Sequence, residues 1–253
     1  MDNYKKTILV TGGSRGIGFE IVSNFLKKNN LIFLNYTTDT KRLQNFISKN
    51  KEQVIPLKAD LSKKNELTKF IKKIFSYKKP PDVIINNAGI ALSSPLSFST
   101  KQWEKNWDKT INLNLKAPAI ICKEIIKRKI KNKNQKKLRI INIASRAAFI
   151  GETEDFAAYA ASKGGLISLT KTLARNYGEK NVLAFSIAPG FVKTSMAEEF
   201  IQKYGKKHAM KGIVLDRLTE PKDIAPVISF IASGNLDHAT GSTIDINGGS
   251  YLR

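Results

Sequence analysis

The residues TILVTGGSRGIGFE, at positions 7–20, decide the fold of this chain. Four apolar residues lead directly into a glycine-rich turn, TGGSRGIG at 11–18, and an amphipathic segment, GFEIVSNFLKK, follows. A buried strand, a tight turn and a helix in this order are typical of the first unit of a nucleotide-binding sheet. Glycines let the backbone approach a pyrophosphate closely, and the helix N-terminus offers it free N–H groups. The turn is therefore a candidate phosphate site.

Two other interpretations of this turn stay open. Its glycines follow the spacing GxxxGxG instead of GxGxxG: Gly12, Gly16 and Gly18. The turn could serve only to join a strand to a helix. It also contains GxSxG, the nucleophile elbow of hydrolases, which would make Ser14 a nucleophile with His208 or His238 as its base. The hydrolase is disfavoured because the elbow normally follows several strands and because no HGGG-like loop precedes it.

Outward from this unit, short apolar runs alternate with longer amphipathic segments. The further predicted strands are LIFLNY (31–36), QVIPLKAD (53–60), DVIIN (82–86), LRIINIAS (138–145), VLAFSIA (182–188) and STIDI (242–246). Predicted helices include NELTKFIKKIF (65–75), a long region before 138, and about 157–177. Strands that are apolar throughout are buried on both faces of a parallel sheet. The pattern predicts an α/β fold, a Rossmann-type doubly wound parallel sheet of about seven strands flanked by helices, in a single domain over 1–253.

Length and composition fit this prediction. The chain has 253 residues, of which 42% are hydrophobic and 25% charged, as in ordinary globular domains. No apolar run reaches the roughly 18 residues that cross a bilayer, and the start MDNYKKTILVTGG does not match a signal peptide. The single cysteine, Cys122, excludes an intramolecular disulfide and a cysteine-based zinc cluster. We expect a cytoplasmic protein that uses no metal and no membrane.

The formal net charge of +22 would suit a nucleic acid, an anionic membrane or an acidic protein. However, the lysines are scattered, and Asn and Ile are also abundant, as codon bias alone would produce. A solvated basic surface without a specific nucleic-acid partner is the simpler interpretation. One basic run, KRKIKNKNQKKLR at 127–139, is expected to form a helix end and an exposed loop.

The end of the second predicted strand bears on the cofactor. An NAD-preferring site usually has an acid there for the ribose 2′-hydroxyl. This chain has Asn35, Tyr36 and Thr37 instead. The absence of a carboxylate favours NADP(H), with NAD(H) possible. Arg15, and also Lys41 or Arg42, are candidates to pair with the 2′-phosphate, whereas Asp39 would reverse the preference if it reached the ribose.

Tyr159 and Lys163 are four residues apart in a predicted helix and so share one face. A tyrosine with a pKa of about 10 exchanges protons poorly at neutral pH, and a nearby ammonium lowers that pKa. Such a pair suits general acid catalysis, although a YxxxK pair on a surface helix is common. Ser145 ends the strand before this helix, where ligand-facing residues gather, and its hydroxyl could hold a carbonyl.

Together these motifs resemble the short-chain dehydrogenase/reductases, and within them most closely the 3-oxoacyl-acyl-carrier-protein reductases. The resemblance runs from Thr7 to the C-terminus. It rests on TGGSRGIG, Asp60, NNAG at 86–89, NLKA from Asn114, Ser145, Tyr159 with Lys163, PGFVKT at 189–194 and NGG at 247–249.

The resemblance implies a role for each matching residue. Tyr159 would be the general acid, Ser145 would bind the carbonyl, and Asn114 would anchor a water. Lys163 would lower the Tyr159 pKa and hold the nicotinamide ribose. The implied cofactor contacts are Gly12, Ser14, Arg15, Gly16, Ile17, Gly18, Asn35, Tyr36, Thr37, Asp60, Leu61, Asn87, Ala88, Gly89, Tyr159, Lys163, Pro189, Gly190, Val192 and Thr194.

The expected activity is NADPH-dependent reduction of a ketone, either a small molecule or a 3-oxoacyl group on an acyl carrier protein. Oxidation of another secondary alcohol (a sugar, polyol or steroid-like alcohol) stays open, because a substrate lid at about 191–215 would decide it. Glu152, Glu154 and Asp155 could face the substrate mouth or form a solvated turn. The family also implies a homotetramer.

Overall fold

The computed structural model describes residues 5–252, apart from the side chains of Glu199 and Lys203. Within this range seven strands form one parallel sheet in the order β3-β2-β1-β4-β5-β6-β7. The strands are β1 (Thr7–Val10), β2 (Leu31–Tyr36), β3 (Val54–Lys58), β4 (Val83–Asn86), β5 (Leu138–Ile143), β6 (Val182–Pro189) and β7 (Thr243–Ile246). The predicted fold class is confirmed, and each predicted strand is present.

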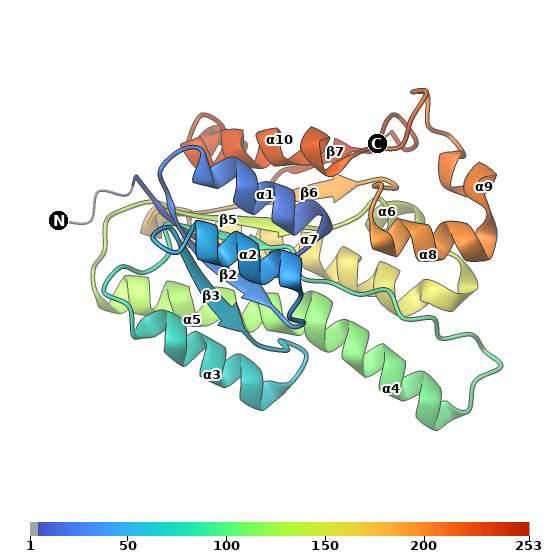
Figure 1. The fold of residues 1–253 in the computed structure, drawn as a ribbon, viewed down its shortest axis with the longest axis horizontal. Coiled ribbons are helices and arrows are strands. Elements are labelled where there is room, and N and C mark those ends of the chain that lie inside the picture. The colour runs from blue at the N-terminus through green and yellow to red at the C-terminus, as the bar shows by residue number, and fades with distance from the viewer. Residues whose placement is uncertain (1–4, 253) are drawn as a thin grey trace.

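Helices cover both faces of this sheet (Figure 1). They are α1 (Gly16–Leu26), α2 (Lys41–Lys49), α3 (Lys64–Phe75), α4 (Thr100–Ile111), α5 (Ala117–Lys131), α6 (Ala147–Ile150), α7 (Ala157–Tyr177), α8 (Ser195–Tyr204), α9 (Lys206–Met210) and α10 (Pro221–Ser233). A π-helical turn, Asn112–Lys116, joins α4 to α5. None of the helices within 5–252 is long and apolar enough for a bilayer crossing.

Helices α2, α6, α8, α9 and α10 were not predicted, and for α2 and α10 the sequence signals are local caps. Before α2, the Thr40 hydroxyl accepts from the Leu43 N–H at 3.1 Å, and Leu43 is the residue that this helix buries. Before α10, Glu220 and Asp223 form a capping box around Pro221. Both caps satisfy N–H groups that have no partner inside the helix.

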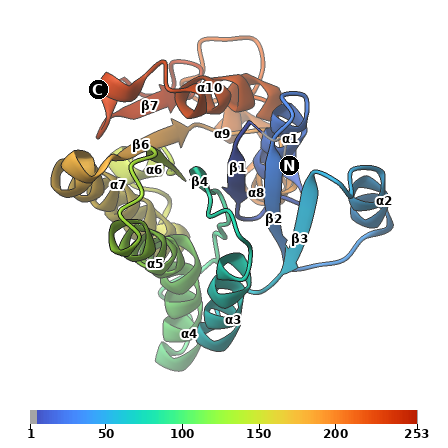
Figure 2. The same ribbon diagram turned by 90° about the vertical axis from the view of Figure 1, so that its left-hand side faces the viewer.

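The sheet lies between two layers of helices (Figure 2), and an apolar core fills the space on each face. Successive side chains of a strand point to opposite faces. Ile8 and Val10 therefore join the core under α1 and α10, whereas Leu9 joins the core under α3, α5 and α7. All three are fully buried, which explains why the strand is apolar without alternation. Burial on both faces fixes the sheet and leaves its carboxyl edge free for a site.

The strand order changes direction between β1 and β4. The tight turn from β1 to α1 lies at this point. A Cβ atom added at Gly18 would lie 2.1 Å from the Gly12 carbonyl oxygen, so only glycine fits. Gly12 itself has a φ of +63°, a conformation that glycine adopts without strain. This contact between backbones brings the start of α1 against the end of β1.

We predict that Gly18→Ala destabilises the fold by about 3 kcal/mol or more, because its methyl group would overlap the Gly12 carbonyl. Gly178→Ala is the matched control, since a Cβ there meets nothing within 4 Å and its φ is −55°. The control should change stability by less than about 1 kcal/mol. Urea denaturation followed by circular dichroism measures both, and equal midpoints for the two variants would contradict the prediction.

Candidate active site

The glycine turn is tied to the end of β4 by side chains that the sequence places far apart. The Thr11 hydroxyl accepts from the N–H groups of Asn87 and Ala88, each at 3.0 Å. The Asn87 amide donates to the carbonyls of Thr11 and Gly12, also at 3.0 Å. Asn87 thus holds the loop together, a role that its motif did not reveal.

The start of α1 is free to receive an anion. Arg15, the residue before the helix, makes no side-chain cap, and the first turn of α1 contains no acidic residue. A Cβ at Gly16 would lie 3.1 Å from the Thr194 methyl group, so a larger side chain would fill the space between the turn and residue 194. A bare cradle of this kind with unpaired N–H groups fits the pyrophosphate of a dinucleotide.

The three residues that end β2 take different positions. The Asn35 side chain is 1% exposed and turns inward: its amide donates to the Leu57 and Ala59 carbonyls at 3.1 Å, and its oxygen accepts from Gly12 N–H at 3.2 Å. Tyr36 is buried in the core, and only Thr37 is exposed. Asn35 therefore supports the glycine turn from behind and does not face a 2′-phosphate.

Asp39 does not remain a free negative charge beside this corner. Its carboxylate pairs with Lys58 and accepts a hydrogen bond from Gln44. The hydrogen bond to Lys58 holds the pKa of Asp39 below its usual range. Nearby, the Arg42 guanidinium lies 4.8 Å from the centre of the Phe19 ring, and Arg15 is exposed. The corner is thus positive on balance.

Ser145, Tyr159 and Lys163 meet where β5 ends against α7. The Ser145 hydroxyl shares a hydrogen bond with Tyr159 and accepts from the Ala147 N–H at 3.1 Å. The Lys163 ammonium lies 5.5 Å from the centre of the Tyr159 ring and donates to the Ile143 carbonyl at 2.7 Å. The predicted pair thus lies on one face of α7, directed at the end of β5 and not at solvent.

Burial sets the acidity of both groups. It raises the pKa of the Tyr159 hydroxyl above its ordinary value; the Ser145 hydrogen bond partly offsets this, and the nearby Glu152 adds to it. Burial also lowers the pKa of Lys163 to about 8, and this side chain is only 4% exposed. The Lys163 ammonium bonds to the Ile143 carbonyl instead of the phenol oxygen, so in this structure it does not offset the effect of burial on the Tyr159 pKa.

Asn114 lies in the π-helical turn and is 1% exposed. Its side-chain oxygen accepts from Ile90 N–H at 2.9 Å, and its amide donates to the Ile90 carbonyl at 2.8 Å and to the Ser162 hydroxyl at 3.0 Å. Ser162 in turn donates to the Tyr159 carbonyl at 2.7 Å. The side chain of Asn114 thus joins the chain after β4 to α7, and Ser162 is a linking residue that the sequence did not single out.

The other predicted cofactor residues lie along the same edge. Asp60 accepts from the Ser62 hydroxyl at 2.6 Å, and Leu61 beside it is buried. A Cβ at Gly190 would lie 2.9 Å from the Asn247 Cα, so the turn after β6 presses against the end of β7. The remaining predicted residues in this edge are Ser14, Ile17, Ala88, Gly89, Pro189, Val192 and Thr194.

The acidic residues before α7 were expected either to face the substrate mouth or to form a solvated turn, and they differ in their positions. Glu154 is exposed, and Glu152 is half-buried and close enough to act on Tyr159. Asp155 is buried instead, at 6% exposure, and accepts from the Tyr204 hydroxyl at 2.8 Å and from Ser93 at 3.2 Å. Asp155 therefore anchors α8, which lies beyond the carboxyl ends of the strands (Figure 1).

The hydrolase interpretation finds no support in the geometry. Within the part of the chain that the structure describes, Ser14 shares no hydrogen bond with either histidine. His208 packs against Phe200 and Tyr204, with ring centres 5.4 and 5.9 Å away, and His238 lies in a short turn before β7. Residues 5–252 also hold no cluster of metal-binding side chains.

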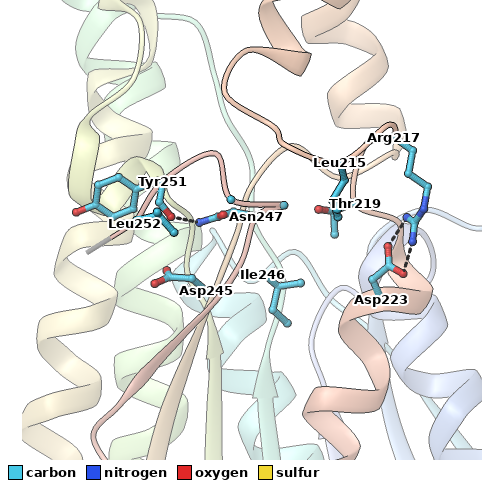
Figure 3. A pocket seen from close by; sticks show the side chains of 11 residues that line it. Leu215, Arg217, Thr219, Asp223, Asp245, Ile246, Asn247, Tyr251 and Leu252 are labelled. Carbon is cyan, nitrogen blue, oxygen red and sulfur yellow. Dashed lines mark hydrogen bonds and ion pairs between the residues drawn. The ribbon is translucent and has the colours of Figure 1, made fainter.

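A separate cavity of about 730 Å³ lies beside the C-terminal segment (Figure 3). Its lining comes from Leu215, Arg217, Thr219, Asp223 and residues 245–249, 251 and 252, with Arg217 paired to Asp223 at 2.6 Å. None of the predicted catalytic side chains lines it. The cavity is therefore not the candidate active site, although its volume is large.

Known proteins resemble the whole chain. The family model described as short chain dehydrogenase matches residues 6–205. The chain is 31% identical over 252 residues to a 3-oxoacyl-[acyl-carrier-protein] reductase of Buchnera aphidicola subsp. Baizongia pistaciae, covering 100% of both. It is 33% identical to the corresponding reductase of Rickettsia typhi, covering 100% of this chain and 99% of the other. A 4-hydroxyisoleucine dehydrogenase complexed with NADH has a TM-score of 0.87 at 31% identity, covering 97% and 98%, and a mutant with NADH and succinate has 0.86.

We predict that Lys163→Met stabilises the protein at neutral pH and destabilises it at high pH. Because burial lowers the Lys163 pKa from 10.5 to about 8, an ammonium here costs up to about 3 kcal/mol below pH 8. Between pH 8 and 10.5 the unfolded chain binds more protons, so wild-type stability rises and that cost disappears. The lost bond to the Ile143 carbonyl costs the variant about 1 kcal/mol at any pH.

The variant should therefore be about 2 kcal/mol more stable than wild type at pH 7 and less stable above pH 10.5. Urea denaturation at a series of pH values measures this. Lys171→Met, which removes an exposed lysine from the same helix, serves as the control. A stability difference that does not change with pH would contradict the buried-ammonium explanation.

Proposed function

The chain belongs to the short-chain dehydrogenase family, and we propose that it is an NADPH-dependent reductase that converts a 3-oxoacyl thioester into the 3-hydroxyacyl form. Family membership makes it a nicotinamide-dependent oxidoreductase that acts on CH–OH groups. The observation that carries the proposal is the grouping of Ser145, Tyr159 and Lys163 at the end of β5. Similarity to two 3-oxoacyl reductases along the whole chain supports the substrate class.

In the proposed reaction, a bound NADPH supplies a hydride to the carbonyl carbon. The Ser145 hydroxyl holds the carbonyl oxygen, and Tyr159 donates its proton to that oxygen as the C=O double bond becomes a C–OH bond. Because the Tyr159 pKa is raised, this hydroxyl keeps its proton at neutral pH. That is the state a general acid needs in the direction of reduction.

Lys163 and Asn114 would restore this proton. With a pKa of about 8, the Lys163 amine can exchange protons near neutral pH. A Cβ at Gly89 would lie 3.4 Å from the Lys163 nitrogen and 3.3 Å from the Asn114 oxygen, so glycine keeps this space open. Since the Asn114 side chain is fully engaged, we propose that a relay water binds its main-chain carbonyl, which the π-helical turn can release.

The preference for NADP(H) follows from the charges at the end of β2. Thr37 and Arg15 are exposed there, Arg42 lies over Phe19, and the Asp39 carboxylate is paired with Lys58. A 2′-phosphate would meet positive charge without facing a free acid. A similar dehydrogenase binds NADH, so NAD(H) remains the alternative cofactor.

We further propose that residues 191–215 form the substrate lid of a single domain spanning the chain. Phe200 and Tyr204 on α8 pack against each other with ring centres 4.5 Å apart, and the Tyr204 hydroxyl donates a hydrogen bond to Asp155. The basic surface would steer an acidic carrier protein toward this entrance. A cytoplasmic homotetramer with no specific nucleic-acid partner is the assembly we expect.

A hydroxy or oxo acid is a second candidate substrate. One similar dehydrogenase structure holds succinate together with NADH. If this chain shares that preference, its substrate carries a carboxylate, and a positive side chain must lie near Ser145.

Tyr159→Phe should lose at least about 99% of the turnover of acetoacetyl thioester, because it removes the hydroxyl that donates the proton. Loss of NADPH absorbance measures the rate, and quenching of protein fluorescence by NADPH should show that the cofactor still binds. Tyr177→Phe, at the far end of α7, is the control. Full turnover by Tyr159→Phe would exclude the mechanism.

Arg15→Ala should raise the KM for NADPH about 10-fold while changing the KM for NADH much less, because only NADPH has the 2′-phosphate. Parallel assays with both cofactors and acetoacetyl thioester provide the comparison. Arg175→Ala removes an exposed arginine elsewhere on α7 and controls for net charge. An equal change for both cofactors would remove Arg15 from the phosphate site.

A further inference from the structure

Arg146 directly follows Ser145 and is the N-cap residue before α6. Its N–H donates to the Pro189 carbonyl at 3.0 Å, which fixes the residue between the ends of β5 and β6. Its guanidinium lies 4.9 Å from the centre of the Phe191 ring, and Phe191 in turn lies 4.8 Å from Phe200 of α8. The charged group is therefore held between the catalytic edge of the sheet and the proposed lid.

This guanidinium is half-buried, and apart from the Phe191 ring no group of the described residues pairs with it. Within residues 5–252 no hydrogen bond or ion pair is formed by its side chain, whereas Arg139, Arg217 and Arg128 each donate to a carboxylate or a carbonyl. Burial lowers the Arg146 pKa, and Glu152 acts on it in the opposite direction without pairing with it. A half-buried arginine that stacks on an aromatic ring and has no ionic or hydrogen-bonding partner among the described residues is arranged for an anion from outside.

Glu152 also locates Arg146 relative to the reacting atoms. The same carboxylate raises the pKa of Tyr159, so both side chains lie within its electrostatic reach. Ser145 and Arg146 are neighbours in the chain, with Cα atoms about 3.8 Å apart, so side chains from one short stretch of backbone would hold the carbonyl and the anion. A short substrate satisfies this spacing, whereas the distant phosphates of a long carrier arm do not.

We propose that Arg146 binds the carboxylate of a short oxo acid and lets this centre reduce such acids in addition to thioesters. The inference rests on the proposed reductase function and adds an anionic substrate class to it. The planar guanidinium can bind a carboxylate through two parallel hydrogen bonds, and the Phe191 ring holds its plane in place. Arg146 would thus select the substrate, with no part in hydride or proton transfer.

The first test compares acetoacetate with its uncharged ester, ethyl acetoacetate, in NADPH oxidation assays. We expect wild type to prefer acetoacetate in kcat/KM, and Arg146→Met to lower the acetoacetate-to-ester ratio about 10- to 100-fold. Arg146→Lys keeps the charge and should retain part of the preference. Arg175→Met, an exposed control on α7, should leave the ratio at its wild-type value.

The second test measures binding without turnover. NMR titration of the protein with NADP⁺ should show tighter binding of butyrate than of butyramide, and Arg146→Met should abolish that difference. Equal binding of both probes by wild type, or an unchanged difference in Arg146→Met, would overturn the inference. Failure of every ketone and thioester to oxidise NADPH would instead reject the proposed function, and the butyrate titration would still decide the role of Arg146.

Discussion

The carbonyl of Gly12 occupies the space that any side chain at position 18 would need, and the site is built around that contact. Because the two backbones touch, α1 starts directly at the end of β1, with its N–H groups directed beyond the sheet. Thr11 and Asn87 then fasten the end of β4 to the same turn. Three elements that meet only at the change in strand order thus form one rigid cradle, and Asn35 supports it from the β2 side.

The end of β5 adds buried polar groups that do not favour folding. The buried Lys163 amine has one hydrogen bond, to the Ile143 carbonyl. The Asn114 side chain uses its hydrogen-bonding groups to join Ile90 to Ser162. An apolar residue in either place would avoid the penalty of burying a polar group. Burial in a low dielectric penalises the Lys163 ammonium, but it also brings the Lys163 pKa to about 8, near neutral pH. A functional role for this pKa would explain why a polar residue occupies this position.

The five inner strands could be predicted because they are buried on both faces, which makes each apolar run continuous and easy to distinguish from a helix; the edge strands β3 and β7 are partly exposed. Helix α2 was missed because it is only nine residues long and its apolar stripe is short: Leu43 is buried, and Phe46 and Ile47 pack against the core beside it. The sequence also did not indicate which way the side chains of Asn35 and Asp155 point. Each depends on partners distant in sequence, Ala59 for the first and Tyr204 for the second. Motifs identified the Tyr159–Lys163 pair, but not that the ammonium would bond to Ile143.

Charge illustrates why local placement matters more than composition for selectivity. A net charge of +22 spread over exposed lysines acts over a Debye length of about 8 Å at physiological salt, and it attracts any anion without distinguishing among them. Arg146 is a single charge, but it is half-buried, stacked on Phe191 and free of an internal partner. Its field is less screened, and its position is set by the same turn that holds Ser145. Discrimination between substrates therefore depends on this one residue more than on the basic surface.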